Sequence, residues 1–408
     1  MGNDTHAPCR VLLAESIHPD AVSALDAAGM EVETVDGALS EQALHERLAT
    51  VDVLGIRSQT QLTEAVLEAA PRLMAVGAFC IGTNQIDLAA ASRRGIAVFN
   101  APFSNTRSVV ELAIAEIIAL TRRLTDKNRS MHDGVWDKSA AGSHEIRGRR
   151  LGIVGYGNIG SQLSVLAETL GLSVWFYDTA DKLALGNAQS CATLDELLES
   201  VDIVTLHVDG RPTNRQLFGE RELSRMRPGS LFLNLSRGFV VDHAALREHL
   251  VSGHLAGAAI DVFPKEPASK SEPFVSELRG LPNVILTPHV GGSTEEAQRD
   301  IGGFVASKLV RYARTGSTSL SVNFPSLDLL EDMGPARLCY SHRNMPGVMG
   351  RMNSLIGEHG LNVEGQLLGN RGDLGYVIAD VSSAVPDQLV RALEGLEATI
   401  RLRVLRPS

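Results

Sequence analysis

Hydrophobic and polar positions alternate in a regular order through the first hundred residues. Short apolar runs predict strands and amphipathic stretches predict helices, in the order 10–14, 20–29, 31–35, 40–48 and 51–56. Strand and helix therefore follow one another as βαβαβ, an order typical of a parallel sheet covered by helices on both faces. We expect a doubly wound α/β domain at the start of the chain.

A long helix, predicted at 106–124, interrupts this order. Its apolar residues lie almost all round, which indicates burial between larger elements, so we expect a domain junction here. A second alternating series runs from Arg150 to about Pro288, and its predicted strands are LGIVGYG, SVWFYD, VDIVTLHV, SLFLNLS, GAAID and NVILTPH. A helix at 294–314 is expected to return the chain to the first domain.

The C-terminal part has a different order, β-α-β-β-α-β. Its strands are predicted at 337–341, 361–368, 375–381 and 399–405, and its helices at 346–359 and 386–396. A Gly-, Ser- and Thr-rich segment and an extended Asn-Phe-Pro precede it and are typical of a linker, 316–325. The expected domains are a first α/β domain from 1–105 and 294–325, a second from 106–293, and a small third domain from 336–408.

Composition and charge narrow the classes of function. The 408 residues have a net charge of −10, which disfavours nucleic acid and anionic membrane as partners because both need a basic face. The N-terminus lacks the pattern of a signal peptide, and no apolar run approaches the ~20 residues of a membrane span. Four cysteines lie far apart, as free thiols do in a reducing compartment. We expect a cytoplasmic protein with a small-molecule substrate.

A glycine motif follows the first strand of the second series. Gly155, Gly157 and Gly160 form GxGxxG around Asn158 and Ile159, and an apolar helix follows directly. In this context the glycines allow a tight turn, close approach of a pyrophosphate and close packing of helix on strand. The free N–H groups and dipole of the helix N-terminus favour an anion there.

An acidic residue ends the next strand. Asp178 lies eighteen positions after Gly160, where a carboxylate would bind the ribose hydroxyls of a dinucleotide. The same carboxylate would repel the 2′-phosphate of NADP. NAD is therefore the expected cofactor, and we predict no metal site.

Three polar residues follow later strands of the same predicted sheet. They are Arg237, Glu266 and His289. Ligands of doubly wound sheets bind at the carboxyl ends of the strands, so these side chains are expected to meet. Arg suits a bidentate carboxylate, His can accept a hydroxyl proton near neutral pH, and a carboxylate can orient the His ring. This trio suits hydride transfer from a 2-hydroxy acid.

The segments GYGNIG, LNLSRGFVVD, AAIDVFPKEP and LTPHVGGST resemble the D-isomer-specific 2-hydroxyacid dehydrogenases. GAFCIGTNQIDL and GIAVFNAPFSNTRSVVELAIAEII are similar to the bacterial D-3-phosphoglycerate dehydrogenase branch of that family. The resemblance implies a flavodoxin-like substrate domain, a Rossmann NAD domain, and a catalytic group of Arg237, Glu266 and His289. It also implies an NAD site lined by Asn158, Ile159, Asp178, Leu235, Ser236, Asp261, His289, Val290, Gly291 and Gly292.

The branch implies a reaction, oxidation of D-3-phosphoglycerate to 3-phosphohydroxypyruvate, the first step of L-serine biosynthesis. Candidate residues for the substrate phosphate are Arg57, Asn105, Arg107 and Lys138. Gln59 stands where the branch commonly has a second Arg, and it keeps open a dehydrogenase or reductase for another D-2-hydroxy acid or 2-keto acid, such as hydroxypyruvate or 2-ketoglutarate. A non-catalytic NAD sensor is a third interpretation, which the retained Arg-Glu-His trio disfavours.

The C-terminal part resembles an ACT domain, a ferredoxin-like amino-acid sensor. His342, Asn344 and Asn362 fit the L-serine-binding pattern of the bacterial branch, and the alternatives are another amino acid or no ligand. The resemblance also implies a homotetramer and an insertion of Trp136 into a neighbouring subunit. The alternative for Trp136 is local packing within its own chain.

Overall fold

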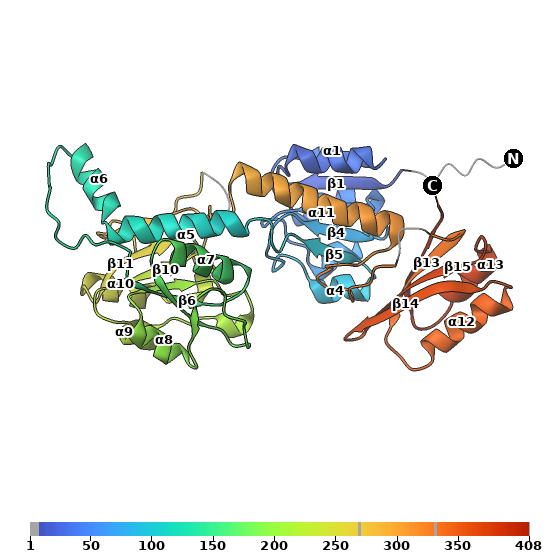
Figure 1. Cartoon of the computed structure of the whole chain (residues 1–408). Coiled ribbons are helices and arrows are strands. Elements are labelled where there is room, and N and C mark those ends of the chain that lie inside the picture. The colour runs from blue at the N-terminus through green and yellow to red at the C-terminus, as the bar shows by residue number, and fades with distance from the viewer. Residues whose placement is uncertain (1–7, 268–270, 330–332, 408) are drawn as a thin grey trace. The chain divides into compact units, whose positions relative to one another are not determined.

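The computed structural model describes residues 8–267, 271–329 and 333–407 (Figure 1). The chain forms two compact units, one from Met1–Pro102 with Gln298–Ser408 and the other from Phe103–Ala297. The first unit contains two separate sheets and the second contains one. The boundaries of the three domains predicted from the sequence stay a prediction.

The N-terminal sheet is parallel, in the order β2-β1-β3-β4-β5. This is the flavodoxin-like order, which confirms the expected fold. Its strands are β1 Arg10–Ala14, β2 Glu31–Val35, β3 Val53–Ile56, β4 Ala75–Ala78 and β5 Ala97–Asn100. Its helices are α1 Pro19–Ala27, α2 Glu41–Arg47, η1 Leu48–Thr50, α3 Glu64–Glu68, α4 Leu88–Arg93 and the long α11 Glu295–Thr315.

The segment predicted as a linker is packed onto β5. Asn323 accepts the Val98 N–H through Oδ1 at 2.8 Å and donates through Nδ2 to the Ile96 carbonyl at 2.9 Å. Ser321 forms a bridge with Phe99. The side chains of Ser321 and Asn323 are buried. The small polar residues of this segment thus form hydrogen bonds with the backbone groups at the edge of the sheet, and the segment is not a free linker.

The sheet of the second unit is also parallel, in the order β12-β11-β10-β9-β6-β7-β8, as in a Rossmann domain. Its strands are β6 Arg150–Val154, β7 Ser173–Tyr177, β8 Gln189–Ser190, β9 Ile203–Leu206, β10 Ser230–Asn234, β11 Leu255–Ile260 and β12 Val284–Leu286. Its helices are α5 Thr106–Thr121, α6 Leu124–His132, α7 Asn158–Thr169, α8 Leu194–Ser200, η2 Pro212–Asn214, α9 Glu220–Arg225, η3 Gly238–Val240 and α10 His243–Val251.

Helix α5 is shorter than the sequence predicts. It ends at Thr121, because Arg123 adopts a left-handed backbone with φ of 50°, and the chain starts again as α6. The apolar pattern predicts burial correctly, since α5 packs on β10, β11 and β12. Its buried face contains Val109, Val110, Ala113, Glu116, Ile117 and Leu120. A carboxylate in this face is unusual, because burial without a partner disfavours charge.

The C-terminal sheet is antiparallel, in the order β14-β15-β13-β16. Its elements are β13 Ala336–Arg343, α12 Val348–Glu358, β14 Val363–Arg371, β15 Leu374–Val381, α13 Asp387–Glu394 and β16 Thr399–Leu405. The βαββαβ order and this sheet confirm the ferredoxin-like prediction. Arg337 is completely buried and pairs with Asp380, with 2.6 Å between Nε and Oδ1.

Two negative observations concern the described part of the chain. No helix there combines the length and apolar character that crossing a membrane requires. No group of three or more His, Cys, Asp or Glu side chains there is arranged to hold a metal ion.

Candidate active site

The glycine motif forms the turn between β6 and α7. Gly155 has φ of +92°, and a Cβ on it would lie 2.6 Å from the His207 carbonyl oxygen. A Cβ on Gly160 would lie 2.3 Å from the Gly155 carbonyl oxygen, so both positions need glycine. By contrast, a Cβ on Gly157 would meet no atom within 4 Å. The loop is therefore tight on its inner side and open outside, before the N-terminus of α7, where a pyrophosphate fits.

Asp178 lies beside this loop, directly after β7. Its Oδ2 accepts the Tyr156 N–H at 2.8 Å and its Oδ1 accepts the Ala180 N–H at 3.0 Å. Two backbone donors thus hold the carboxylate at the end of the strand, next to the glycine motif. The position fits the ribose hydroxyls of NAD and opposes a 2′-phosphate. The loop and this carboxylate together fit the predicted cofactor.

His289 and Glu266 are in contact. His289 Nδ1 lies 2.9 Å from Glu266 Oε2, and because a carboxylate only accepts, Nδ1 carries the proton in this bond. Glu266 is held in turn by the Phe263 N–H, which donates to its Oε1 at 3.1 Å. His289 Nε2 is therefore the nitrogen left to act as a base. The imidazole is about half exposed (49%), so a small substrate can reach it.

The contact between His289 and Glu266 shifts their pKa values in opposite directions. The hydrogen bond to Glu266 raises the pKa of His289, and it outweighs burial, which lowers that pKa. Burial raises the pKa of Glu266, but the hydrogen bond from His289 and the charge of His289 bring it below its ordinary value. An ionised Glu266 at this distance can stabilise a protonated His289 ring, which is the role that the sequence predicts for it.

Arg237 follows β10 and lies near the same pair. A Cβ on Gly238 would lie 1.9 Å from the Phe263 carbonyl carbon, so the chain after β10 packs directly on the segment that leads to Glu266. Arg237 Nη1 donates to the Ser236 carbonyl at 2.7 Å. The Arg237 charge lowers the pKa of His289 and contributes to lowering that of Glu266. The structure thus brings the three predicted catalytic side chains together.

The segment after β12 is shaped by Asp261. This residue is 1% exposed, and its Oδ1 accepts from the Thr287 hydroxyl at 2.6 Å and from the Val290 N–H at 2.8 Å. Its Oδ2 accepts the Gly291 N–H at 2.9 Å. His289 has φ of +55°, a conformation that a histidine rarely adopts without such support. The carboxylate of Asp261 thus organises this segment, and its predicted contact with the cofactor stays a prediction.

Other predicted cofactor residues have side chains turned into the protein. Leu235 and Ser236 are 6% and 5% exposed, and Ser236 donates both its N–H and its hydroxyl to Asn234 Oδ1. Ile159 packs against the core between α5 and the sheet. Any contact of Leu235 or Ser236 with a cofactor would therefore use their backbone, whereas Ile159 is only partly buried. Asn105 Nδ2 would lie 2.2 Å from a Cβ on Gly292, so these two positions are neighbours.

The candidate phosphate residues belong to both units of the chain. Arg57 belongs to the unit of the N-terminal sheet, whereas Asn105, Arg107 and Lys138 belong to the Rossmann unit. Arg107 pairs with Glu111 one turn along α5, with 2.6 Å between Nε and Oε1. The side chain of Lys138 is exposed. Their shared role in binding the substrate phosphate stays a prediction.

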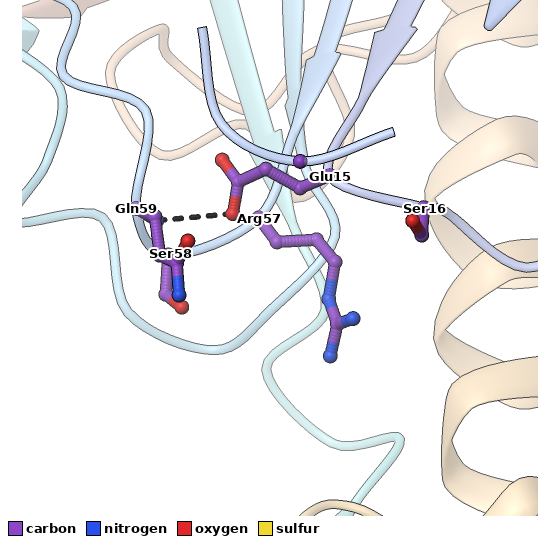
Figure 2. A pocket seen from close by; sticks show the side chains of 6 residues that line it. Glu15, Ser16, Arg57, Ser58 and Gln59 are labelled. Atoms are coloured by element: carbon purple, nitrogen blue, oxygen red, sulfur yellow. Dashed lines mark hydrogen bonds between the residues drawn. The ribbon is translucent and has the colours of Figure 1, made fainter. Parts of the chain in front are cut away.

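Arg57 lines a surface hollow of about 240 Å³ with Glu15, Ser58 and Gln59 (Figure 2). The buried Glu15 carboxylate accepts the Gln59 N–H at 3.0 Å and the Thr60 N–H at 2.8 Å. Figure 2 shows the Arg57 side chain extending away from that carboxylate. Sequence reasoning missed Glu15, which fixes the Arg57 loop across 44 positions of chain.

The three predicted effector residues lie in the C-terminal sheet domain. His342 is 2% exposed, its Nδ1 bonds the Arg343 carbonyl at 2.8 Å, and its buried Nε2 has no hydrogen-bond partner. Asn344 is exposed and donates to the Gly372 carbonyl at 3.2 Å. Asn362 is exposed, and its N–H donates to Ser382 Oγ at 3.0 Å.

Replacing Glu266 by Gln tests the coupling of this pair. The carboxylate raises the pKa of His289, so the variant should lower that pKa, and the acid limb of kcat/KM for oxidation should move to lower pH. Because the ring is also less well held, kcat should fall about tenfold or more. Initial rates between pH 5 and 9 measure both effects. An unchanged acid limb would show that Glu266 does not control His289.

Comparisons with known proteins identify the family of the chain. Residues 114–291 match the NAD-binding domain of the D-isomer specific 2-hydroxyacid dehydrogenases, and residues 338–401 match the AHAS small subunit-like ACT domain. The chain is 50% identical to D-3-phosphoglycerate dehydrogenase of Escherichia coli K12 over 97% of each chain. It is 44% identical to D-3-phosphoglycerate dehydrogenase 1 of Saccharomyces cerevisiae, over 97% of this chain and 87% of that one.

A solved structure is also similar to most of this chain. The NAD-dependent formate dehydrogenase of Staphylococcus aureus, in complex with NAD, is 28% identical with a TM-score of 0.64. The match covers 74% of this chain and 95% of that one. The chain therefore belongs to the D-isomer-specific 2-hydroxyacid dehydrogenase family, among the D-3-phosphoglycerate dehydrogenases with a C-terminal ACT domain, and is an NAD-dependent oxidoreductase.

Proposed function

We propose that this enzyme oxidises D-3-phosphoglycerate at C2 to 3-phosphohydroxypyruvate, the first step of L-serine biosynthesis. The observation that supports it most is the hydrogen bond between His289 and Glu266 beside Arg237, in a chain so similar throughout to D-3-phosphoglycerate dehydrogenases. When bound, NAD accepts the hydride that leaves C2.

The protein side of the reaction follows from the three side chains. Arg237 binds the substrate carboxylate through its planar guanidinium and so orients C2. His289 accepts the C2 hydroxyl proton at Nε2, and the C2–O bond becomes a carbonyl as the hydride leaves. Glu266 keeps the ring oriented and stabilises its positive charge. The balance is one hydride to the cofactor and one proton to His289, released later to water.

A panel of substrates tests the proposal. We expect kcat/KM for D-3-phosphoglycerate to exceed that for D-glycerate by tenfold or more, because a charged contact to phosphate contributes on the order of 1.5–3 kcal/mol. Arg57→Gln should reduce this preference and leave turnover of D-glycerate in place. Arg72→Gln is the control, since Arg72 is an exposed arginine of the same unit that pairs with Asp52.

A second function has one specific residue in its favour. Gln59 stands beside Arg57 in the surface hollow and offers no positive charge. If the panel shows fast reduction of hydroxypyruvate or 2-ketoglutarate with NADH and no use of phosphoglycerate, the enzyme is a reductase for unphosphorylated keto acids. The family assignment would then stand and the proposed substrate would be wrong.

We also propose that L-serine binds the ACT domain and inhibits the enzyme. His342 supports this, because an unpartnered ring nitrogen in a buried place needs a hydrogen-bond partner that a ligand can supply. Isothermal titration with L-serine should show binding that His342→Ala abolishes while D-serine gives none. The absence of both binding heat and inhibition would contradict it, and binding of another amino acid would change the effector.

We propose a homo-oligomer, with the homotetramer as the assembly that the resemblance implies. Trp136 is 74% exposed, and Met131 and Val135 next to it are also more than half exposed. Large apolar side chains gathered on one short segment favour burial against a partner. The earlier alternative, local packing of Trp136, has little support from this exposure.

A further inference from the structure

One buried acidic side chain has no part in the reaction described above. Glu116 lies on α5, in the middle of the face that packs on the Rossmann sheet, and is 3% exposed. Neither of its carboxyl oxygens has a hydrogen-bond partner. A buried ionised carboxylate without partners is strongly disfavoured, so this side chain needs an explanation.

The neighbours of Glu116 connect it to the catalytic segment. A Cβ on Gly291 would lie 3.0 Å from Asp261 Oδ2, 3.5 Å from Val109 Cγ2 and 3.9 Å from Leu112 Cδ2. Residues 112 and 116 are one turn apart on α5, so they share the face turned to Asp261. The Asp261 charge acts on Glu116, and the Thr287 hydroxyl, which donates to Asp261, lies near it.

Like charges repel, so we expect only one of the two neighbouring carboxyl groups, Glu116 and Asp261, to be ionised. Asp261 already accepts three hydrogen bonds, at Oδ1 from Thr287 and Val290 and at Oδ2 from Gly291, so both of its oxygens act as acceptors. A second buried carboxylate beside it would be repelled, so the proton belongs on Glu116. Burial first, and then the Asp261 charge, raise the pKa of Glu116 from its ordinary 4.5 to about 8.

Few charged side chains lie on the described elements that pack on α5, and β11 contains none. β10 and β12 contain no ionisable side chain, and α7 contains only Glu168, which is bonded to the Asn187 N–H. In α6, Asp126 pairs with Arg123 and Lys127 pairs with Asp137, and Arg129 and His132 of this helix are exposed.

We propose that Glu116 is a positioning residue for the His289 segment, acting through Asp261 and Thr287 as a neutral carboxylic acid. As long as it is neutral, Asp261 keeps its three donors and the left-handed turn at His289 is held. When it ionises, repulsion between the two carboxylates disturbs the turn and the base. The effect of Glu116 on kcat/KM rests on the proposed function. The protonation of Glu116 itself does not depend on the substrate.

The test has one readout without substrate and one with it. In the infrared difference between wild type and Glu116→Gln, the carbonyl band of a protonated carboxylic acid should be present at pH 6.5 and replaced by carboxylate bands at alkaline pH. The kcat/KM for oxidation by wild type should fall about tenfold per pH unit above the same midpoint, as a single ionisation requires. Glu116→Gln should lack this fall.

Glu199→Gln is the matched control. Glu199 is an exposed glutamate on α8 of the same unit, paired with Arg225 at 2.8 Å, and its replacement should leave the alkaline fall and the acid band in place. A carboxylate band for Glu116 at pH 6.5 would overturn the proposal, as would an alkaline fall that persists in Glu116→Gln. If Glu116→Gln does not fold, the infrared titration with ¹³C-labelled glutamate in wild type still decides whether a buried acid is present. If wild type does not oxidise D-3-phosphoglycerate at any pH, the proposed function is contradicted, but the infrared result on the protonation of Glu116 still stands.

Discussion

Replacing His289 by Gln is expected to lower kcat by about 10²–10⁴-fold, the range that a positioned general base contributes. Glutamine has a similar length but cannot accept a proton near neutral pH. The hydrogen bond from Nδ1 to Glu266 at 2.9 Å leaves Nε2 as the base, so the loss should be in the chemical step. Steady-state rates with D-3-phosphoglycerate and NAD measure it.

The loss must be separated from a loss of folding or of cofactor binding. NADH affinity, followed by fluorescence, should stay within a few-fold of wild type, because the glycine motif and Asp178 are untouched. His45→Gln is the control, a histidine that is 42% exposed on α2 and beside Glu41. Retention of more than a tenth of the wild-type kcat in His289→Gln would identify a different base.

Replacing Arg237 by Gln should raise KM for the hydroxy acid about 30-fold or more. Loss of one partner of a charged, hydrogen-bonded pair costs on the order of 2–5 kcal/mol. Arg237→Lys should be intermediate, because an ammonium keeps the charge but not the bidentate geometry. Since the Arg237 charge also lowers the pKa of His289, the acid limb of kcat/KM should move to higher pH in Arg237→Gln.

Arg215 offers a comparison in the same unit. Its guanidinium lies over the Phe239 ring, 5.4 Å from the centroid. Arg215→Gln should change KM and the acid limb little. A KM for Arg237→Gln close to that of wild type would show that another residue binds the carboxylate.

Much of the fold could be predicted from local pattern. Strands such as 31–35 and 399–405 have the bounds that their apolar runs predict, since burial of alternating or continuous apolar residues depends on short-range sequence. The break at Arg123 could not be predicted, because it depends on a single residue in a left-handed conformation within an otherwise helical pattern. The packed segment at 316–325 was also missed, since its partners on β5 lie more than 220 positions away.

The site divides in the same way. The trio and the glycine motif could be predicted because parallel strands bring their carboxyl ends to one edge. The interior roles of Asp261, Glu15 and Glu116 could not, because each depends on which backbone or carboxyl group lies opposite. One signal for Glu116 was available: it is a carboxylate in the apolar face of the helix at 106–121.

Transfer of label from C2 tests the central claim most directly. The enzyme is incubated with NAD and D-3-phosphoglycerate deuterated at C2, with hydrazine to trap the keto product, and the reduced cofactor is examined by mass spectrometry. The proposed reaction predicts one deuterium in each NADH formed and 3-phosphohydroxypyruvate as the trapped product, with no transfer in His289→Gln beyond its residual rate. Unlabelled NADH, or no reduction of NAD by this substrate, would contradict it.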